Sequence, residues 1–177
     1  MKKALTIASL FLTFLIIYFL QANFFNWFTI AGIKPNMFVI LVLFVSLFTK
    51  MEYGIGFGIF IGFILDVIIG QKIGATSILL GIVAVLGGIF DKNFSKDSRI
   101  TLILMVTSST AVFEVGNYIF SAIQLSINIE PLQFIRVLII EIIYNIFITI
   151  IIYPLIQKVG YLIEDIFKGQ KILTRYF

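Results

Sequence analysis

Residues 35–69 decide the fold, and they read PNMFVILVLFVSLFTKMEYGIGFGIFIGFILDVII. Two apolar runs stand on either side of residues 49–53, which contain Lys50 and Glu52. One continuous helix would hold both charges at the centre of the hydrocarbon layer, where a charge is costly. We therefore predict two membrane helices joined by a tight turn at the membrane surface. The first helix is short for a crossing of roughly 20 residues, and Lys34 and Lys50 are expected to let it span by reaching the headgroups along their aliphatic stems.

The whole chain has the composition of a membrane protein. Of its 177 residues, 60% are hydrophobic and 12% are charged, whereas a soluble domain carries roughly 25% charged residues. We predict an all-α polytopic membrane protein whose six transmembrane helices form one bundle and one domain, 1–177. The predicted helices cover about residues 4–20, 35–48, 54–69, 74–90, 100–123 and 132–156. A charged cytoplasmic tail is expected at 157–177.

The basic residues predict the orientation of the bundle. In the six-helix arrangement one side of the membrane holds Lys2, Lys3, Lys50, Lys92, Lys96, Arg99, Lys158, Lys168, Lys171 and Arg175. The other side holds Lys34 and Lys72, with Arg136 just inside the last helix. Because loops rich in Lys and Arg stay in the cytoplasm, we expect both termini there. Topology thus explains the net charge of +4, and no nucleic-acid partner is expected.

Two residue types are missing from the sequence, which contains neither Cys nor His. Their absence removes disulfides, thiol nucleophiles, Ser-His triads and metal sites built on these side chains. The sequence also contains no Gly-rich phosphate loop, and no pair of nucleophile and base can be named. We therefore expect no catalytic residues, no metal and no cofactor, and hence no enzyme.

Small residues line one face of the predicted helix 54–69. Gly54, Gly58, Gly62 and Asp66 follow one another at four-residue spacing and so lie on the same side of a helix. Another helix can approach such a face closely. Two interpretations stay open: packing on a neighbouring helix of the same chain, or contact with a partner protein. Gly74, which opens the next helix, is grouped with this face.

Polar side chains form stripes on the last two predicted helices. One stripe consists of Thr110, Glu114, Asn117 and Ser121, and the other of Glu141, Asn145 and Thr149. Lipid cannot satisfy these groups, so both stripes are expected to face the interior as an intramembrane polar network. Asp66, Glu114 and Glu141 are expected to meet in the outer half of the bundle. That meeting point is either a satisfied network that fixes helix register, or a functional pocket or partner contact.

The order of motifs from Pro35 to Gly74 points to a family. A short helix that begins at Pro35 is followed by a glycine helix reading GIFIGFILD over residues 58–66, and then by Gly74 at the start of the next helix. This combination resembles the bacterial rod shape-determining MreD family, and the likeness in length, number of helices and short basic tail covers most of the chain. The resemblance implies a non-enzymatic scaffold in the cell-shape and peptidoglycan elongation machinery of the bacterial cytoplasmic (inner) membrane. Its implied partners are MreC, bound through membrane helices, the actin-like MreB, RodA and a class B penicillin-binding protein.

A second function stays open. The MreD family is also similar to the substrate-binding subunits of energy-coupling-factor vitamin transporters, six-helix bundles that hold a small ligand in the outer half. The expected meeting of three acids there makes a substrate-binding subunit of a vitamin-type membrane transporter the alternative. The predicted outer loops at 70–73 and 124–131 are short and offer few ligand-facing groups. The scaffold is therefore the leading hypothesis, with the glycine face or the two polar stripes as its contact with MreC.

Overall fold

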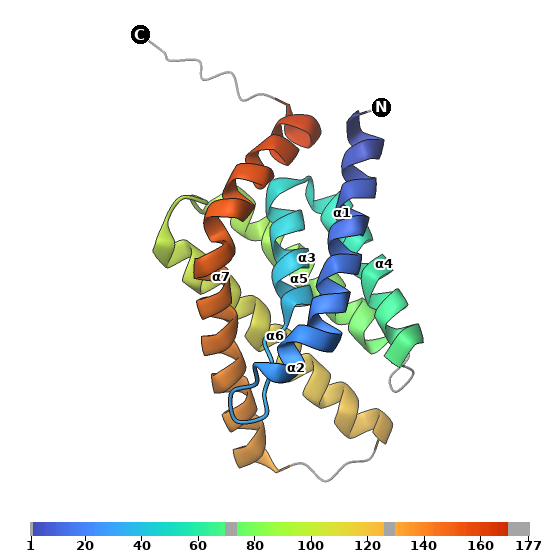
Figure 1. The fold of residues 1–177 in the computed structure, drawn as a ribbon, viewed down its shortest axis with the longest axis vertical. Helices are drawn as coiled ribbons and strands as arrows, with labels where there is room; N and C mark the ends of the chain where they lie inside the picture. Colours follow the sequence, from blue (N-terminus) through green and yellow to red (C-terminus); the bar gives the residue numbers. More distant parts are fainter. Residues whose placement is uncertain (1, 70–73, 126–129, 170–177) are drawn as a thin grey trace.

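The computed structural model describes residues 2–69, 74–125 and 130–169 (Figure 1). In this part of the chain the regular secondary structure is helical, apart from an isolated β-bridge between Ile30 and Ile33. Five of the described helices are long and apolar enough to cross a membrane, and a further apolar helix is shorter. The predicted all-α polytopic fold is confirmed.

The described helices follow one another along the chain. They are α1 (Lys2–Phe19), which continues through the π-helical segment η1 (Leu20–Phe24) into the short α2 (Phe25–Trp27), then α3 (Met37–Phe48), α4 (Met51–Ile69), α5 (Ala75–Asn93), α6 (Arg99–Leu125) and α7 (Pro131–Lys168). The start of α1 and the end of α7 lie at the same end of the bundle, as do the α3–α4 and α5–α6 connections (Figure 1). We call this the terminal end and the opposite one the distal end. Such an arrangement is expected for an even number of crossings.

Helix α3 is the centre of the bundle. All its residues except Phe38 are buried, and α1, α4, α5, α6 and α7 all pack against it. A helix that is apolar on every side is stable when other elements surround it. Its 12 residues rise only about 18 Å. Because protein encloses this helix, its length need not match the bilayer; that Lys34 and Lys50 reach the headgroups stays a prediction.

Glycines bring α3, α4 and α5 into close contact. A Cβ added at Gly54 on α4 would lie 2.5 Å from Cβ of Ser46 on α3, and one added at Gly58 would lie 2.7 Å from the carbonyl oxygen of Leu80 on α5. Gly87 on α5 approaches Ser46 in the same way, with an added Cβ 2.9 Å from its Cβ. Small residues thus pack these helices together, and lipid supplies little hydrophobic drive for such contacts.

Helix α7 is longer than the sequence predicted. It runs through residues 157–168, which the prediction assigned to a charged tail, while residues 170–177 lie outside the described part of the chain. The extension is helical because Gly160, Glu164 and Phe167 on one of its faces are buried against the bundle. Charged residues such as Glu164, which in the sequence marked the end of the membrane helix, thus belong to the helix and pack against the bundle.

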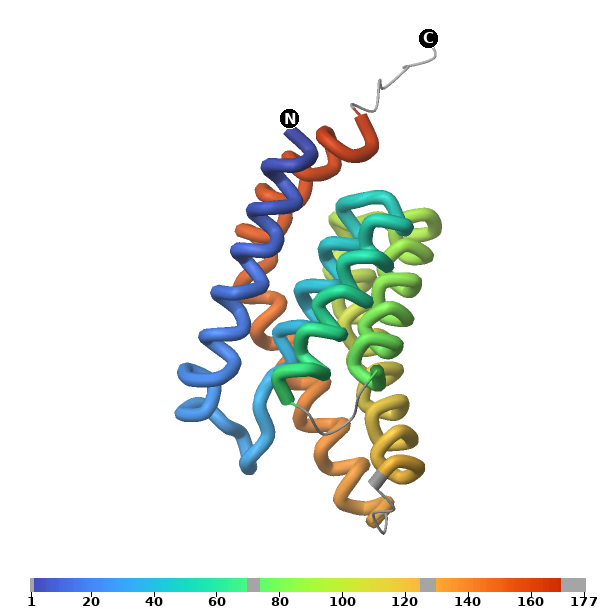
Figure 2. Tube along the Cα trace, turned by 90° about the vertical axis from the view of Figure 1, so that its right-hand side faces the viewer, coloured from blue at the N-terminus to red at the C-terminus, as the bar shows by residue number. Residues whose placement is uncertain are grey.

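Helix α1 lies at the outside of the bundle, on the side of the terminal part of α7 (Figure 2). Only Leu10 and Phe14 on it are buried. An apolar groove of about 330 Å³ runs between α1 and α7 over α3. Residues of all three helices line it: Ser9, Leu10, Thr13, Ile17, Met37, Ile40, Leu41, Phe44, Val45, Phe48, Ile152, Leu155, Ile156, Val159, Gly160 and Ile163. We call it the α1–α7 groove.

Candidate functional site

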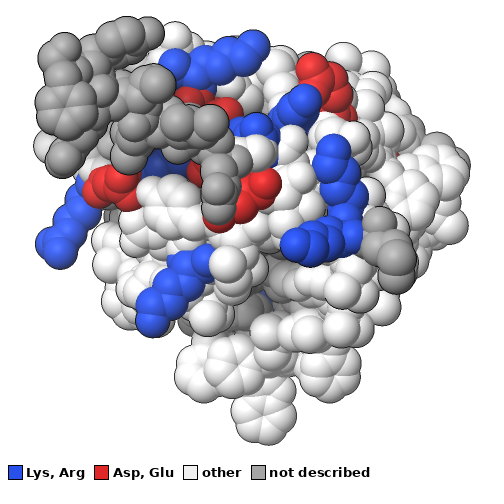
Figure 3. All heavy atoms as spheres, turned by 90° about the horizontal axis from the view of Figure 1, so that it is seen from above, with Lys and Arg blue, Asp and Glu red and all other residues white. Residues whose placement is uncertain are grey.

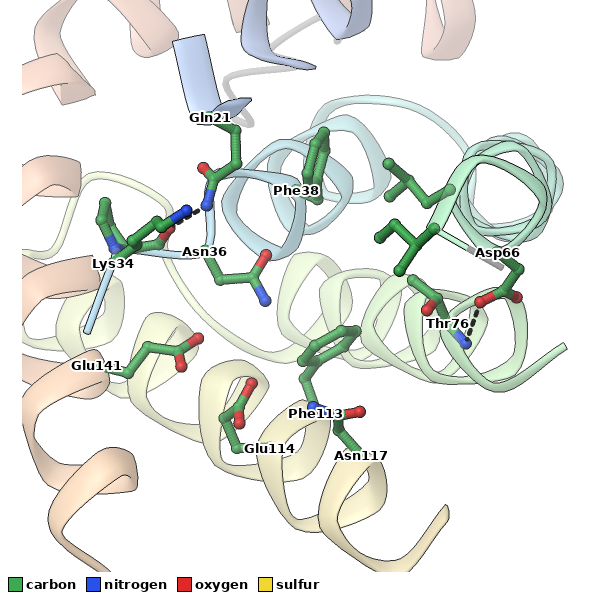
Figure 4. A pocket seen from close by; sticks show the side chains of 13 residues that line it. Gln21, Lys34, Asn36, Phe38, Asp66, Thr76, Phe113, Glu114, Asn117 and Glu141 are labelled. Carbon is green, nitrogen blue, oxygen red and sulfur yellow. Dashed lines mark hydrogen bonds between the residues drawn. The ribbon is translucent and has the colours of Figure 1, made fainter. Parts of the chain in front are cut away.

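A cavity of about 360 Å³ lies in the distal half of the bundle, where η1, the segment before α3, and helices α3 to α7 meet (Figure 4). Its polar lining consists of Gln21, Lys34, Asn36, Asp66, Thr76, Glu114, Asn117 and Glu141, and its apolar lining of Pro35, Phe38, Leu65, Ile69 and Phe113. The three acids that the sequence expected to meet all line this space. We call it the distal cavity.

Asp66 has a defined structural task in the wall of the distal cavity. One carboxylate oxygen accepts a hydrogen bond from the backbone N–H of Thr76 at 3.1 Å, and the other accepts one from Ser77 at 3.0 Å. These N–H groups belong to the first turn of α5, where a helix leaves its donors unsatisfied. Asp66 therefore caps α5 from α4, and its negative charge favours that helix end.

Amide side chains hold the chain that leads into α3. The side-chain oxygen of Asn36 accepts a hydrogen bond from the backbone N–H of Val39 at 3.3 Å and so caps α3. The backbone N–H of Asn36 donates to the side-chain oxygen of Asn145 on α7 at 2.7 Å. Gln21 donates to the carbonyl of Pro35 at 2.6 Å. Sequence reasoning missed Gln21 and Asn36, although an Asn directly before an apolar run is a helix-start signal.

The polar stripes of α6 and α7 face one another inside the bundle. Asn145 donates a hydrogen bond to the hydroxyl of Thr110 at 2.9 Å. Asn145, Thr110 and Thr149 all have 0% exposure. Thr149 is thus a buried polar residue beyond the Asn145–Thr110 hydrogen bond. Its hydroxyl has no hydrogen-bond partner among the described residues. The buried members of both stripes are thus internal, whereas Asn117 and Ser121 on α6 are half-buried.

Glu114 on α6 and Glu141 on α7 point into the distal cavity and toward one another (Figure 4). Both are buried, with 9% and 6% exposure. Oε1 of Glu141 is buried and has no hydrogen-bond partner among the residues that the structure describes. Two carboxyl groups this deep in a membrane bundle repel one another when both are ionised. The site is therefore suited to receive a proton or a positively charged group.

The glycine face of α4 is not an open surface. Gly54, Gly58 and Gly62 are buried against α3 and α5, and a Cβ at Gly62 would overlap the backbone of Ser77. The geometry is that of helix packing within the chain, so the interpretation as a partner contact is wrong for these residues. Gly74 is not part of the packing face either, because nothing lies within 4 Å of a Cβ placed there. Its backbone instead has φ +87°, which a glycine adopts freely at the start of α5.

A network of four charges ties α5, its following loop and α7 together at the terminal end. Nζ of Lys96 lies 2.7 Å from Asp91 and 2.7 Å from Glu164, and Nζ of Lys168 lies 2.7 Å from Asp91 and 3.6 Å from Glu164. Lys168 also donates to the carbonyl of Leu47 at the end of α3. We call this the terminal ion network. Sequence analysis counted Lys96 and Lys168 as topological charges and did not predict it.

Lys96 is the most enclosed member of the terminal ion network. Its side chain is 8% exposed, and Nζ lies 5.1 Å from the ring centroid of Phe48. Burial alone would lower the pKa of Lys96, but the hydrogen bonds and charges of Asp91 and Glu164 outweigh this, and the pKa is raised above its ordinary value of 10.5. The charged form of Lys96 is therefore part of the folded state.

Basic side chains are concentrated at the terminal end. Figure 3 looks onto this end and shows Lys and Arg side chains spread over it, with acidic ones among them. The exposed basic residues of the terminal helix ends and connections are Lys2, Lys3, Lys50, Lys92, Arg99 and Lys158. At the distal end the described basic residues are Lys34 and Arg136, while Lys72, Lys171 and Arg175 of the predicted distribution lie outside the described residues.

Comparison with known families agrees with the motifs and the helix arrangement. The family model described as rod shape-determining protein MreD matches residues 1–160. The chain belongs to the MreD family. Membership makes it a multi-pass membrane protein of rod-shape determination, and the family is not a known family of enzymes. In comparisons with curated proteins and with solved structures, nothing matched this chain. Within the described residues, no group of three or more His, Cys, Asp or Glu side chains could hold a metal ion.

Proposed function

We propose that this MreD-family protein is a non-enzymatic scaffold of the cell-shape and peptidoglycan elongation complex, and that it binds a membrane helix of MreC. The observation that carries the proposal is the family match over residues 1–160. MreB, RodA and a class B penicillin-binding protein are the further members of the complex. The concentration of basic residues at the terminal end supports a position in the bacterial cytoplasmic (inner) membrane with this end toward the cytoplasm.

We propose the α1–α7 groove as the binding site for the MreC helix. The glycine face and most of the two polar stripes are buried within the chain, which favours another surface for the contact. The groove is apolar, and Ser9 and Thr13 among its lining residues are small enough for close helix approach. Since α1 buries only Leu10 and Phe14 in the chain itself, much of its surface is free for a partner.

Two bulky substitutions on opposite sides of α7 test this proposal. Val159 lines the groove and is 47% exposed, whereas Ile150 is 53% exposed and lies on the other side of the same helix. Val159→Trp should lower the recovery of MreC in mild detergent about tenfold or more, because overpacking an interface costs about 1–3 kcal/mol. Ile150→Trp should leave recovery unchanged.

The same comparison can be repeated from the other wall of the groove. Ser9→Trp on α1 should act like Val159→Trp, with Leu15→Trp as the control because Leu15 is exposed and does not line the groove. Full recovery of MreC with both groove variants, each inserted and folded, would remove the groove from the proposal. If the unchanged protein itself recovers no MreC, the scaffold proposal fails.

A further inference from the structure

The distal cavity contains a buried acceptor that has no partner among the described residues. Glu141 is 94% buried (6% exposed), and its Oε1 accepts no hydrogen bond from any described residue. Leaving a buried polar atom of this kind unpaired costs free energy. Figure 4 shows the carboxyl group projecting into the cavity. The missing donor can therefore come from a molecule that enters the cavity.

The other polar groups of the cavity narrow the place where such a donor can bind. Both carboxylate oxygens of Asp66 already accept hydrogen bonds from the start of α5. The amide of Gln21 is held by its bond to Pro35. Glu141, with Glu114 turned toward it, thus marks the acceptor end of the cavity (Figure 4).

The walls of the cavity select an organic group over a bare metal ion. Phe38, Phe113 and Leu65 belong to the apolar part of the lining. A divalent cation needs six or more oxygen ligands, or a rigid octahedral set, and an aromatic wall supplies none. Aromatic rings instead attract organic cations over their faces. The volume of about 360 Å³ is in the range of small-molecule sites, about 300–1,000 Å³.

We propose that the distal cavity binds a molecule carrying a primary ammonium group, whose N–H donors reach Glu141 beside Glu114. Lys34 is exposed and lines the cavity, so it meets an anionic group that the molecule carries next to its ammonium. This chemistry belongs to phosphoethanolamine, either as the headgroup of a phospholipid or in free form. The proposal goes beyond the scaffold role and does not depend on the MreC contact.

Four probes in two matched pairs test the inference on the full chain purified in detergent. The pairs are dihexanoyl phosphatidylethanolamine with dihexanoyl phosphatidylcholine, and glycerophosphoethanolamine with glycerophosphocholine. The choline forms keep the charge and remove every N–H donor. A ligand that binds the folded state raises Tm in a saturable manner. We expect saturable rises with ethanolamine forms and none with choline forms. A rise with the phospholipid alone identifies a lipid headgroup, and a rise with both ethanolamine forms identifies a site that also takes the free group.

Substitutions tie the effect to the cavity. Glu141→Gln should raise the concentration for half-maximal shift at least tenfold, because a charged acceptor for the ammonium is lost. Asp165→Asn, at an exposed acid of the same helix, should leave it unchanged. If Glu141→Gln does not fold, Glu114→Gln takes its place with the same expectation. The proposal is overturned if ethanolamine forms give no saturable shift, if choline forms act equally, or if the cavity variants respond like the unchanged protein.

Discussion

The two ends of this bundle use buried acids in opposite ways. At the terminal end, Asp91 and Glu164 each lie 2.7 Å from Nζ of Lys96, so that every charge faces its opposite. In the distal cavity, Glu141 is more deeply buried than these acids, yet its Oε1 has no partner among the described residues. Acidic side chains therefore stabilise the fold at the terminal end, whereas in the distal cavity Glu141 is available to bind another molecule.

The difference has a physical basis in how burial is compensated. Breaking a buried ion pair leaves an uncompensated charge, which destabilises a protein strongly. The carboxyl oxygen Oε1 of Glu141, which has no partner among the described residues, contributes no such bond, so replacing it does not break one. Substitution of an acid of the terminal ion network should thus lower the free energy of unfolding, whereas substitution of Glu141 should weaken ligand binding.

The largest effect is expected for Lys96→Met. This substitution leaves Asp91 and Glu164 facing each other without the ammonium between them. We expect a loss of about 3–5 kcal/mol in the free energy of unfolding, measured by denaturation in mixed detergent micelles. Lys92→Met, at an exposed position of α5 next to Asp91, is the matched control and should leave stability unchanged. Equal stability of the two variants would show that the terminal ion network does not hold the fold.

Asp66→Ala should have an intermediate effect and sharpen the comparison inside the distal cavity itself. Asp66 lines the same space as Glu141, but both its oxygens accept hydrogen bonds from α5. Loss of a helix cap costs about 0.5–2 kcal/mol, so we expect about 1–2 kcal/mol. Glu52→Ala, at an exposed acid in the first turn of α4, should cost less. An Asp66 variant as stable as the unchanged protein would contradict the capping role.

A smaller and reversible effect is expected from pH. The pKa of Lys96 is raised in the folded protein above the ordinary value of 10.5. Its contribution to stability is therefore fully present below this ordinary value, and is lost as the pH rises through the raised one. The difference in stability between the unchanged protein and Lys96→Met should be constant from about pH 7 to pH 10 and shrink above that range. A difference that falls already between about pH 7 and pH 9 would contradict the raised pKa.

The sequence predicted the helices of this protein and much of the distal cavity. Regular spacing gave the glycine face, and the need to keep Glu114 and Asn145 away from lipid placed both inside the bundle. What the sequence left open was decided by tertiary contacts. The glycine face packs on α3 and α5 because Ser46 and Ser77 offer room only for hydrogen at Gly54 and Gly62, and spacing alone does not specify that neighbour.

The terminal ion network could not be predicted for a similar reason. Lys96 and Glu164 are far apart in the sequence, and their pairing depends on the extension of α7 beyond the apolar run. Charge at the end of such a run is the ordinary sign of a membrane surface. The enclosed position of α3 was equally hidden, since its composition also fits a short crossing helix.

The central claim is that paired acids hold this fold and that Glu141 is kept for another function. The direct measurement is the free energy of unfolding of Glu141→Gln and Glu164→Gln, determined side by side in the same mixed micelles. We predict that Glu164→Gln loses about 2–3 kcal/mol because Lys96 keeps its charge with one acid fewer, while Glu141→Gln stays within about 1 kcal/mol of the unchanged protein. A loss for Glu141→Gln as large as that for Glu164→Gln would contradict the account.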